Sequence, residues 1–439
     1  MTQIESAEKE VKHALNFNFP LSSAANSSSL HQATTSRIPG FAKMSARGRV
    51  SALAERLKLS AAEVQVLLST GALPLEIAEN FIENCIGGFT LPLGVATNFL
   101  IDGQEVLIPM AVEESSVVAA ASHGAKLARS GGGFFSTAAR SVATCQIQFK
   151  SEITNVFERF SDFRSQIHQI AENCHPRLLG RGGGVLDVEL RALSKPGNYV
   201  IHIHVDTCEA MGANIVNTMA EEVGRHLPTL LPCAVGLRIL TNLTVHRVTK
   251  VSCFINPASL AMGGFSGEEA VDRICSAWEF ADLDPFRAAT HNKGVMNGID
   301  PVVIATGNDW RAVEAGCHAF ASLSGQYKPL TQWSKRSDGF LEGNIAVPIA
   351  VGTVGGVTQL HPSAAAALRI MGNPNSHRLA CLIASVGLAQ NLSALRALAC
   401  EGIQKGHMAL HDKNIEMMRR YDHMPQLSAV HQKTPISQD

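Results

Sequence analysis

Charged and amide side chains gather around a short apolar run between residues 287 and 311 (RAATHNKGVMNGIDPVVIATGNDWR). Lys293 and Asn297 precede the run at 301–306 (PVVIAT), and Asp309 follows it. Burial and a nearby carboxylate are the two environments that shift the pKa of a lysine and make it useful in chemistry. These residues are therefore candidates for one site. The same pattern also fits a surface turn, a core strand and a second turn, with the charges solvated.

The segment Met211–Asn214 (MGAN) follows an expected strand and opens an expected helix. A helix N-terminus in this position can hold a diphosphate, although a plain strand-to-helix turn fits the spacing equally well. The glycine runs at 180–184 (GRGGG) and 352–356 (GTVGG) lack the GxGxxG spacing, and the sequence has no Walker A lysine motif. A Rossmann or P-loop domain is therefore not expected.

Two histidine pairs have spacings that deserve a test as metal ligands. His407 and His411 are four residues apart in an expected helix, but neither an HExxH motif nor a paired Cys/His partner accompanies them. We therefore predict no metal site. His202 and His204 share one face of an expected strand, and we interpret this face as solvated.

Composition narrows the class of protein. The chain has 439 residues, with 37 Lys and Arg against 38 Asp and Glu, a balance that disfavours binding to nucleic acid or to an anionic membrane. Ten cysteines occur singly without a CxxC spacing, which is typical of reduced thiols in a cytoplasmic protein. The sequence begins without a signal-peptide pattern, and we predict no membrane span.

The elements expected from periodicity indicate an α+β protein. Helix-rich flanks surround a β-rich block, and Glu114 follows the second strand of a hairpin whose turn is Asp102–Gly103. A capping box, Ser60 with Glu63, is expected to open a helix. We predict a disordered extension (1–35), a large catalytic domain (36–139 and 256–402), an inserted cofactor domain (140–255) and a short C-terminal flap (403–439).

Seven blocks in order resemble the class II, soluble prokaryotic-type 3-hydroxy-3-methylglutaryl-coenzyme A (HMG-CoA) reductases. The resemblance runs from about residue 36 to about residue 413. The blocks are ENxIG (83–87), PMAxxE ending at Glu114, MGAN (211–214), HNKGxxNGID (291–300), ATGNDWR (305–311), GTVGG (352–356) and GHMALH (406–411).

The resemblance implies reduction of HMG-CoA to mevalonate and free coenzyme A by two hydrides from successive nicotinamides. It places the family's catalytic residues on Glu114, Lys293, Asp309 and His407, and substrate contacts on Arg287, Asn297, Ser116 and Lys126. It further implies a homodimer, or a higher oligomer of dimers, in which Asp309 faces the Glu114 and Lys293 of its neighbour. An alternative is a coenzyme A-thioester hydrolase or lyase that uses the same acid and base residues without nicotinamide.

The resemblance also assigns cofactor binding to Met211, Gly212, Ala213 and Asn214. Two departures from the family pattern concern this cofactor. Glu209 stands where aspartate is usual before AMGAN, and His175, with Arg177 and Arg181 nearby, stands where NADH-specific members carry an aspartate. Because a 2′-phosphate is anionic, this basic surrounding favours NADPH over NADH. The tail after His407 is also shorter than the family's usual flap.

Overall fold

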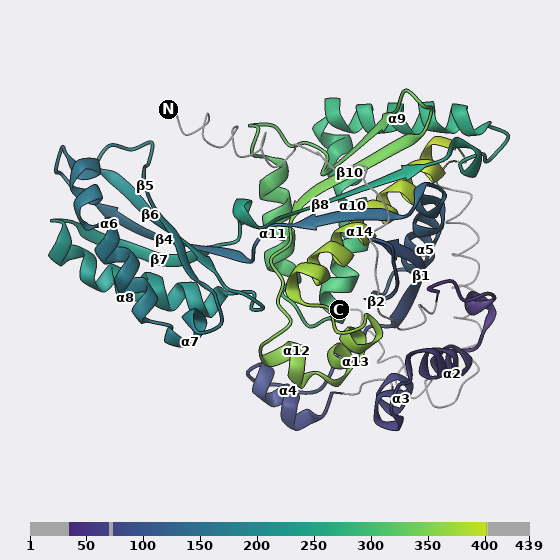
Figure 1. The fold of residues 1–439 in the computed structure, drawn as a ribbon, viewed down its shortest axis with the longest axis horizontal. Helices are drawn as coiled ribbons and strands as arrows, with labels where there is room; N and C mark the ends of the chain where they lie inside the picture. The colour runs from purple at the N-terminus through teal and green to yellow at the C-terminus, as the bar shows by residue number, and fades with distance from the viewer. Residues whose placement is uncertain (1–34, 70–72, 401, 403–439) are drawn as a thin grey trace, which may run out of the picture.

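The computed structural model describes residues 35–69, 73–400 and 402. Within them, buried apolar side chains form two main cores, one in each of the two parts seen in Figure 1. The part at the right of the view contains a six-stranded sheet, and the part at the left contains a four-stranded sheet. The structure thus confirms the expected α+β class.

The larger sheet has the strand order β2-β1-β3-β8-β10-β9 and is antiparallel except where β1 meets β3. Its strands are β1 (Leu93–Ile101), β2 (Gln104–Ala111), β3 (Phe134–Ala138), β8 (Val248–Ile255), β9 (Thr331–Lys335) and β10 (Leu341–Pro348). Asp102 and Gly103 turn β1 into β2, and both have a positive φ, at 52° and 74°. A two-residue turn of this kind matches the twist of a hairpin, so the predicted hairpin is confirmed.

Helices pack on this sheet and closely against one another. The central one is α14 (Ser376–Cys400), which contacts α5 (Val117–Ala128), α9 (Gly267–Leu283) and α10 (Pro285–Ala305). Glycines permit these close approaches. A Cβ on Gly124 of α5 would lie 2.0 Å from the Ala389 carbonyl oxygen, and one on Gly298 of α10 would lie 2.7 Å from that of Val386. The backbones of α5 and α10 are therefore fixed directly against the backbone of α14.

Shorter helices complete the larger part. At the bottom of Figure 1, the helices near the N-terminus lie beside α13. Ser60 and Glu63 form the expected capping box. The helices are α2 (Ala46–Leu57), α3 (Ala61–Leu68), α4 (Leu75–Phe81), α11 (Trp310–Ala321), α12 (Gly356–Leu360) and α13 (Pro362–Ile370), with short 3-10 turns at η1 (Phe41–Lys43), η2 (Arg129–Gly131) and η4 (Pro257–Ser259).

The smaller part is an antiparallel sheet in the order β5-β6-β4-β7, with helices packed on it. The alternating residues Ile201 and Ile203 of β6 point into its core, together with apolar residues of two long helices. The elements are β4 (Val142–Lys150), α6 (Val156–Asn173), α7 (Pro176–Leu179), β5 (Gly184–Ala192), β6 (Asn198–Asp206), α8 (Ala213–Leu230), β7 (Ala234–Thr241) and the 3-10 turn η3 (Val245–Arg247).

Two expectations about these boundaries were wrong. The expected inserted block ends at residue 255, whereas β8 pairs with β3 and β10 of the larger sheet. The run 301–306 was expected as a core strand between two turns, whereas it continues α10, which spans Pro285–Ala305. Asp284 caps that helix by accepting a hydrogen bond from the Arg287 amide, and Pro285 occupies its first turn, which suits proline. Apolar residues cannot distinguish a buried helix from a buried strand over so short a run.

Three further observations concern the cysteines, a possible membrane span and the expected segments at the two ends of the chain. The ten cysteines all lie among the described residues, and each is a free thiol. In the described part of the chain, α14 is long and apolar enough to cross a membrane, but 89% of its most apolar window is buried inside the protein. The expected extension, apart from residue 35, and the expected flap with His407 and His411 lie outside the described residues.

Candidate active site

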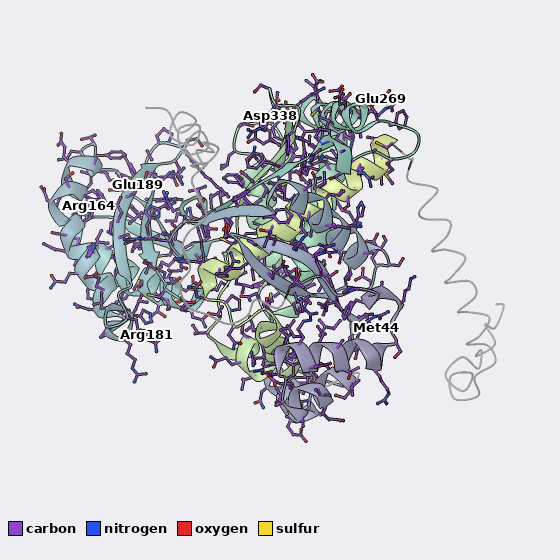
Figure 2. All side chains as sticks on the ribbon, turned by 45° about the vertical axis from the view of Figure 1, so that its right-hand side comes forward. Met44, Arg164, Arg181, Glu189, Glu269 and Asp338 are labelled. Atoms are coloured by element: carbon purple, nitrogen blue, oxygen red, sulfur yellow. The ribbon has the colours of Figure 1, made fainter. Side chains whose placement is uncertain are left out.

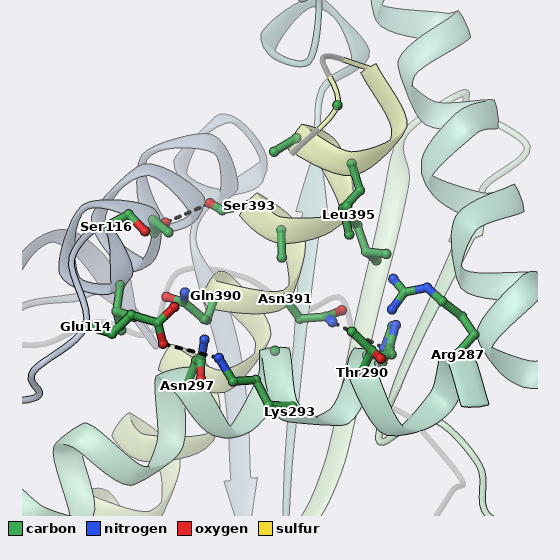
Figure 3. A pocket seen from close by; sticks show the side chains of 18 residues that line it. Glu114, Ser116, Arg287, Thr290, Lys293, Asn297, Gln390, Asn391, Ser393 and Leu395 are labelled. Carbon is green, nitrogen blue, oxygen red and sulfur yellow. Dashed lines mark hydrogen bonds and ion pairs between the residues drawn. The ribbon is translucent and has the colours of Figure 1, made fainter. Parts of the chain in front are cut away.

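A cavity of about 340 Å³ opens where α5, α10 and α14 meet (Figure 3). Polar groups from three separate segments line it: the turn after β2, α10 and α14. They include five of the residues expected in the site, Glu114, Ser116, Arg287, Lys293 and Asn297, and also Thr290, His291, Gln390, Asn391 and Ser393. An enclosed, largely apolar pocket with a few convergent polar groups is the usual form of a small-molecule site.

The central contact of the cavity joins Lys293 to Glu114. The Lys293 Nζ lies 3.2 Å from the Glu114 Oε2 (Figure 3). Their side chains are 61% and 41% exposed in the single chain. The expected burial of Glu114 is therefore not provided by this chain alone. An exposed pair of this kind adds little to stability, so its position at the mouth of a cavity is better explained by chemistry than by folding.

The helix α10 presents its polar residues to the cavity because of its periodicity. Arg287, Thr290, Gly294 and Asn297 follow each other at intervals of three or four residues, which places them on one face of a helix. The expectation that Arg287 and Asn297 lie together with Lys293 is met by this geometry. Burial lowers the pKa of the Arg287 guanidinium from its ordinary value, and at that high starting value the group stays charged.

A buried hydrogen-bond network supports the floor of the cavity. His291 is 1% exposed, and its Nε2 lies 2.7 Å from the Thr331 Oγ1 and 3.2 Å from the Asn391 Nδ2. Asn391 also accepts from the Trp333 Nε1 at 2.8 Å. Burial, followed by the charge of Arg287, lowers the pKa of His291 to about 3. This imidazole is therefore neutral and fixed in one orientation.

Sequence reasoning missed the contribution of α14. None of its residues was expected in the site, yet Gln390, Asn391 and Ser393 line the cavity. Ser393 donates to the Ala120 carbonyl oxygen at 2.7 Å, which ties α14 to α5. The available signal was the polar pair Gln390–Asn391 within an otherwise apolar helix, since a buried amide must have hydrogen-bond partners.

Two expected site residues lie away from this cavity. Asp309 caps α11 by accepting from the Ala312 amide at 3.1 Å, and it is not among the residues that line the cavity. Because α10 is continuous from Lys293 to Ala305, a rise of about 1.5 Å per residue places Ala305, four residues before Asp309, about 18 Å from Lys293. Lys126 is exposed near the end of α5, roughly 15 Å along that helix from Ser116.

The expected cofactor segment lies at the N-terminus of α8. Gly212 is the N-cap residue, with a φ of 106°. Because glycine has no side chain, no capping side chain among the described residues bonds to the first N–H groups of α8. Such free N–H groups favour a diphosphate. The buried Arg247 lies beside them and donates to the Met211 carbonyl oxygen at 3.1 Å. Met211, Gly212, Ala213 and Asn214 therefore form a turn whose partial and full positive charges suit a nicotinamide dinucleotide.

The contacts of Glu209 explain why a glutamate, which is longer than the usual aspartate, can stand at this position. Its Oε2 accepts from the Ser376 amide at 2.7 Å and from the Thr353 Oγ1 at 3.0 Å. Burial opposes ionisation, but these hydrogen bonds prevail and lower the pKa of Glu209. The carboxylate therefore fastens the turn before α8 both to the glycine loop 352–356 and to the start of α14.

The residues expected near a 2′-phosphate belong to α7 and the loop after it. His175 is the N-cap residue of α7, and Arg177 is exposed two residues later. Arg181, which Figure 2 labels on the smaller part, accepts a hydrogen bond at its carbonyl oxygen from the Cys208 thiol at 3.7 Å. This contact brings the loop after α7 next to the turn that leads into the cofactor segment.

Comparisons with known proteins identify the class of protein to which this fold and cavity belong. The family model described as hydroxymethylglutaryl-coenzyme A reductase matches residues 45–412. The chain therefore belongs to the hydroxymethylglutaryl-coenzyme A reductase family, as the motifs suggested.

Relatives agree over most of the chain. A 3-hydroxy-3-methylglutaryl-coenzyme A reductase of Archaeoglobus fulgidus is 46% identical over 396 residues, with 89% of each chain covered. A probable enzyme of the same name in Borreliella burgdorferi is 36% identical and covers 76% of this chain and 77% of its own.

Solved structures point to class II. The 3-hydroxy-3-methylglutaryl-coenzyme A reductase of Streptococcus pneumoniae superposes with a TM-score of 0.80 at 37% identity, over 87% of this chain and 91% of its own. A structure of the class II enzyme from the same organism, bound to NADPH in open conformations, gives a TM-score of 0.78 and covers 82% of this chain and 99% of its own.

Proposed function

We propose that this chain interconverts HMG-CoA with mevalonate and coenzyme A by two successive hydride transfers. The observation that carries the proposal is the Lys293–Glu114 pair at the mouth of a cavity that Arg287 and Asn297 also line. Bound NADPH or NADH supplies the two hydrides. The first reduction gives a hemithioacetal, which releases coenzyme A and leaves an aldehyde, and the second reduction gives the alcohol.

Lys293 and Glu114 act on the oxygen of the reacting carbonyl. Hydride attack places negative charge on that oxygen, and the Lys293 ammonium stabilises it electrostatically. Glu114 supplies the proton that the aldehyde oxygen needs during the second reduction, as a general acid. Their 3.2 Å separation allows both groups to reach one oxygen atom.

Asp309 completes the site from a second copy of the chain. Within one chain, Asp309 contacts the Ala312 amide and Arg311 rather than Lys293, so a homodimer is the arrangement that would bring the two together. The carboxylate then keeps Lys293 charged, couples it to Glu114 and, with the neighbouring subunit around it, supplies the burial that Glu114 lacks in the single chain.

An exposed apolar segment supports such a dimer. Ile82 is 59% exposed, Ile86 is fully exposed and Phe89 is 95% exposed. Three large apolar side chains within the ENxIG region do not remain in water without cause, and clustered exposure of this kind marks protein interfaces.

His407 is proposed to protonate the departing coenzyme A thiolate. A free thiolate would attack the aldehyde again, so its protonation makes departure effectively irreversible. Ala397, Leu398 and Gly402 line the cavity, and this position of the preceding residues supports the proposal. The five residues from Gly402 to His407 span at most about 17 Å, a reach compatible with the thiolate.

The remaining contacts concern substrate and cofactor. Arg287 suits a bidentate pair with the substrate carboxylate, Asn297 and Ser116 hold the hydroxymethylglutaryl group, and Lys126 meets a phosphate of coenzyme A. The α8 N-terminus holds the dinucleotide, and His175 with Arg177 favours NADPH over NADH. The absence of any cysteine pairing supports a reducing compartment, the cytoplasm.

Turnover with purified chain tests this function. We expect two molecules of NADPH to be oxidised for each coenzyme A thiol released from HMG-CoA. The variant Lys293→Ala should lose this activity, while Lys335→Ala, which breaks only an exposed pair with Asp272, should keep it. Thiol release without NADPH oxidation would instead identify a thioester hydrolase or lyase.

A further inference from the structure

The four-stranded sheet of the smaller part has a second face that the reductase site does not use. Ile201 and Ile203 of β6 point into the apolar core, so His202 and His204, which alternate with them, point to the opposite face. Contrary to the expectation of a solvated face, these two side chains are only 8% and 7% exposed. A buried pair of imidazoles on a sheet surface requires polar neighbours.

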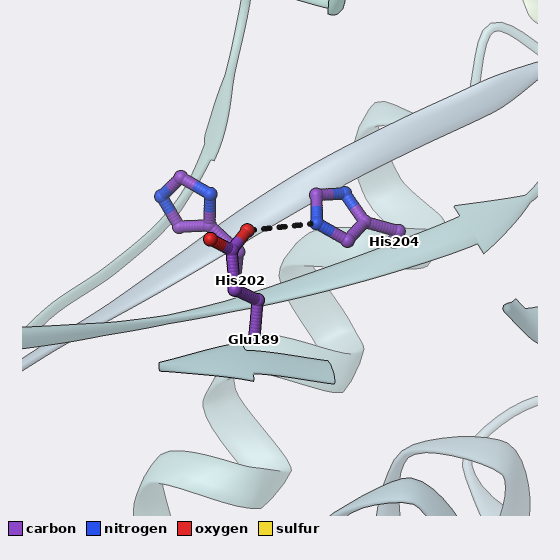
Figure 4. Close-up of side chains that lie close together, drawn as sticks. All are labelled: Glu189, His202 and His204. Carbon is purple, nitrogen blue, oxygen red and sulfur yellow. Dashed lines mark ion pairs between the residues drawn. The ribbon is translucent and has the colours of Figure 1, made fainter. Parts of the chain in front are cut away.

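The strand register supplies those neighbours. His202 stands opposite Glu189 of β5 on one side and opposite Gln146 of β4 on the other. His204 stands opposite Thr144 of β4. The Glu189 carboxylate lies between the two imidazole rings in Figure 4, so three groups from two strands converge on one point.

The spacing of these groups fits a shared cation better than a direct hydrogen bond. One ligand atom from each of Glu189, His202 and His204 lies within 4.8 Å of the others. The His204 Nε2 is 3.6 Å from the Glu189 Oε2, which exceeds ordinary hydrogen-bond length. Ligands at 2.0–2.2 Å from a tetrahedral Zn²⁺ are roughly 3.4 Å apart. The pair at 3.6 Å is within a few tenths of an ångström of this spacing, and a pair at the 4.8 Å limit would close by about 1.4 Å through side-chain rotation.

The groups behind the rings hold them ready for ligation. The Thr144 Oγ1 lies 2.9 Å from the His204 Nδ1. When that nitrogen donates to Thr144, the Nε2 lone pair faces Glu189, which is the usual way an outer partner orients a metal-binding histidine. The Gln146 Nε2 and the Arg191 Nη1 lie 2.8 Å and 3.3 Å from the His202 Nε2. Nδ1 of His202 becomes the ligand atom when Nε2 carries the proton, which requires the Gln146 amide to turn its oxygen toward Nε2 and the Arg191 side chain to move away.

Charged and titratable neighbours decide whether a cation can enter. The Arg191 Nη1 lies 3.3 Å from the His202 Nε2 and opposes a second positive charge. The ring of His246 lies 4.5 Å from that of His204, between centroids.

We propose that Glu189, His202 and His204 form a site for a divalent transition-metal ion of the Zn²⁺ type, with water in the fourth position. Two imidazoles and one carboxylate are a common ligand set for this ion. The expectation of no metal site rested on the His407–His411 spacing. The third ligand, Glu189, comes from a neighbouring strand, where sequence spacing gives no signal.

Titration of the full-length chain with Co²⁺ and Zn²⁺ under reducing conditions tests this site. We expect one Co²⁺ per chain with the strong visible bands of tetrahedral nitrogen and oxygen coordination, without thiolate charge transfer, and displacement of Co²⁺ by Zn²⁺. His204→Gln and Glu189→Gln should lose this binding. The matched control His226→Gln, on α8 beside Glu222, should retain it. The thermal midpoint of each variant reports its folding.

Two variants that keep all three ligands make the test independent of ligand removal. Thr144→Val should weaken Co²⁺ binding by about 10–100-fold, as the loss of an outer partner commonly does. Arg191→Ala should tighten it, because the opposing charge is gone. Equal binding by the parent chain and by His204→Gln, bands of thiolate ligation alone, or no bound ion would overturn the proposal. None of these outcomes bears on the reductase function.

Discussion

Substitution of Gly124 by alanine should disturb the active site through the packing of two helices. The new Cβ would lie 2.0 Å from the Ala389 carbonyl oxygen, so α5 and α14 must separate by more than 1 Å to restore an ordinary contact of roughly 3.3 Å. The same two helices carry Ser116 and Gln390 into the cavity. The clash therefore displaces cavity groups without removing any of them.

The expected change in the free energy of unfolding is the sum of two opposing effects. Replacement of a glycine inside a helix by alanine stabilises the helix by about 1 kcal/mol, whereas forced overpacking costs about 1–3 kcal/mol, and here the neighbour is rigid backbone. We expect a net loss of stability of up to about 2 kcal/mol. Misplacement of catalytic groups by about 1 Å can lower kcat about 100-fold.

Thermal unfolding and steady-state kinetics measure the two effects. Gly294→Ala on α10 is the matched control for stability, because its Cβ would meet nothing within 4 Å; it should raise the unfolding midpoint. If Gly124→Ala were as stable as Gly294→Ala and fully active, the close approach of α5 to α14 would not exist as described.

Three further predictions concern single contacts. Lys293→Ala should leave the thermal midpoint unchanged, because that side chain is 61% exposed, while kcat falls to background. Glu209→Ala should raise the KM for NADPH more than it lowers kcat, because the turn before α8 loses its bonds to Thr353 and Ser376. Glu105→Gln should destabilise the chain by about 1–3 kcal/mol, because the partly buried Arg129 loses its carboxylate partner and keeps only its bond to the Asn98 carbonyl oxygen; an unchanged midpoint in thermal unfolding would contradict this prediction.

The Glu105 contact also sets a pH dependence. Burial opposes ionisation, but hydrogen bonds from Arg129 and Ser36 lower the pKa of Glu105 from 4.5 to about 2. A carboxyl with a depressed folded-state pKa stabilises the fold above its unfolded pKa and loses that contribution as protons bind. The parent chain should therefore lose stability between pH 4.5 and pH 2, and Glu105→Gln should lack this part of the loss.

Local signals in the sequence were sufficient for several elements. The Asp102–Gly103 turn and the Ser60–Glu63 capping box depend on neighbours in sequence, and both occur as expected. The motifs also identified the polar residues on one face of α10. They did not predict that α10 is one continuous helix, because an apolar run that ends in a glycine turn is equally compatible with a strand.

Contacts between segments that are distant in the chain could not be predicted from local sequence patterns. Gln390 and Asn391 reach the cavity because α14 crosses α10 at a glycine, a choice of packing that leaves no local pattern. Glu189 meets His202 because of strand register, which is fixed by the whole sheet. The family motifs identified the chemistry, whereas the three-dimensional structure assigned distances to it.

The central claim is that two chains build each active site, Lys293 from one and Asp309 from the other. Lys293→Ala and Asp309→Ala chains with different affinity tags can be co-expressed and the doubly tagged heterodimer isolated. One of its two sites then lacks both groups and the other lacks neither, so we predict about half of the parent dimer's activity from two variants that are each inactive alone. A heterodimer as inactive as either parent variant would contradict the account.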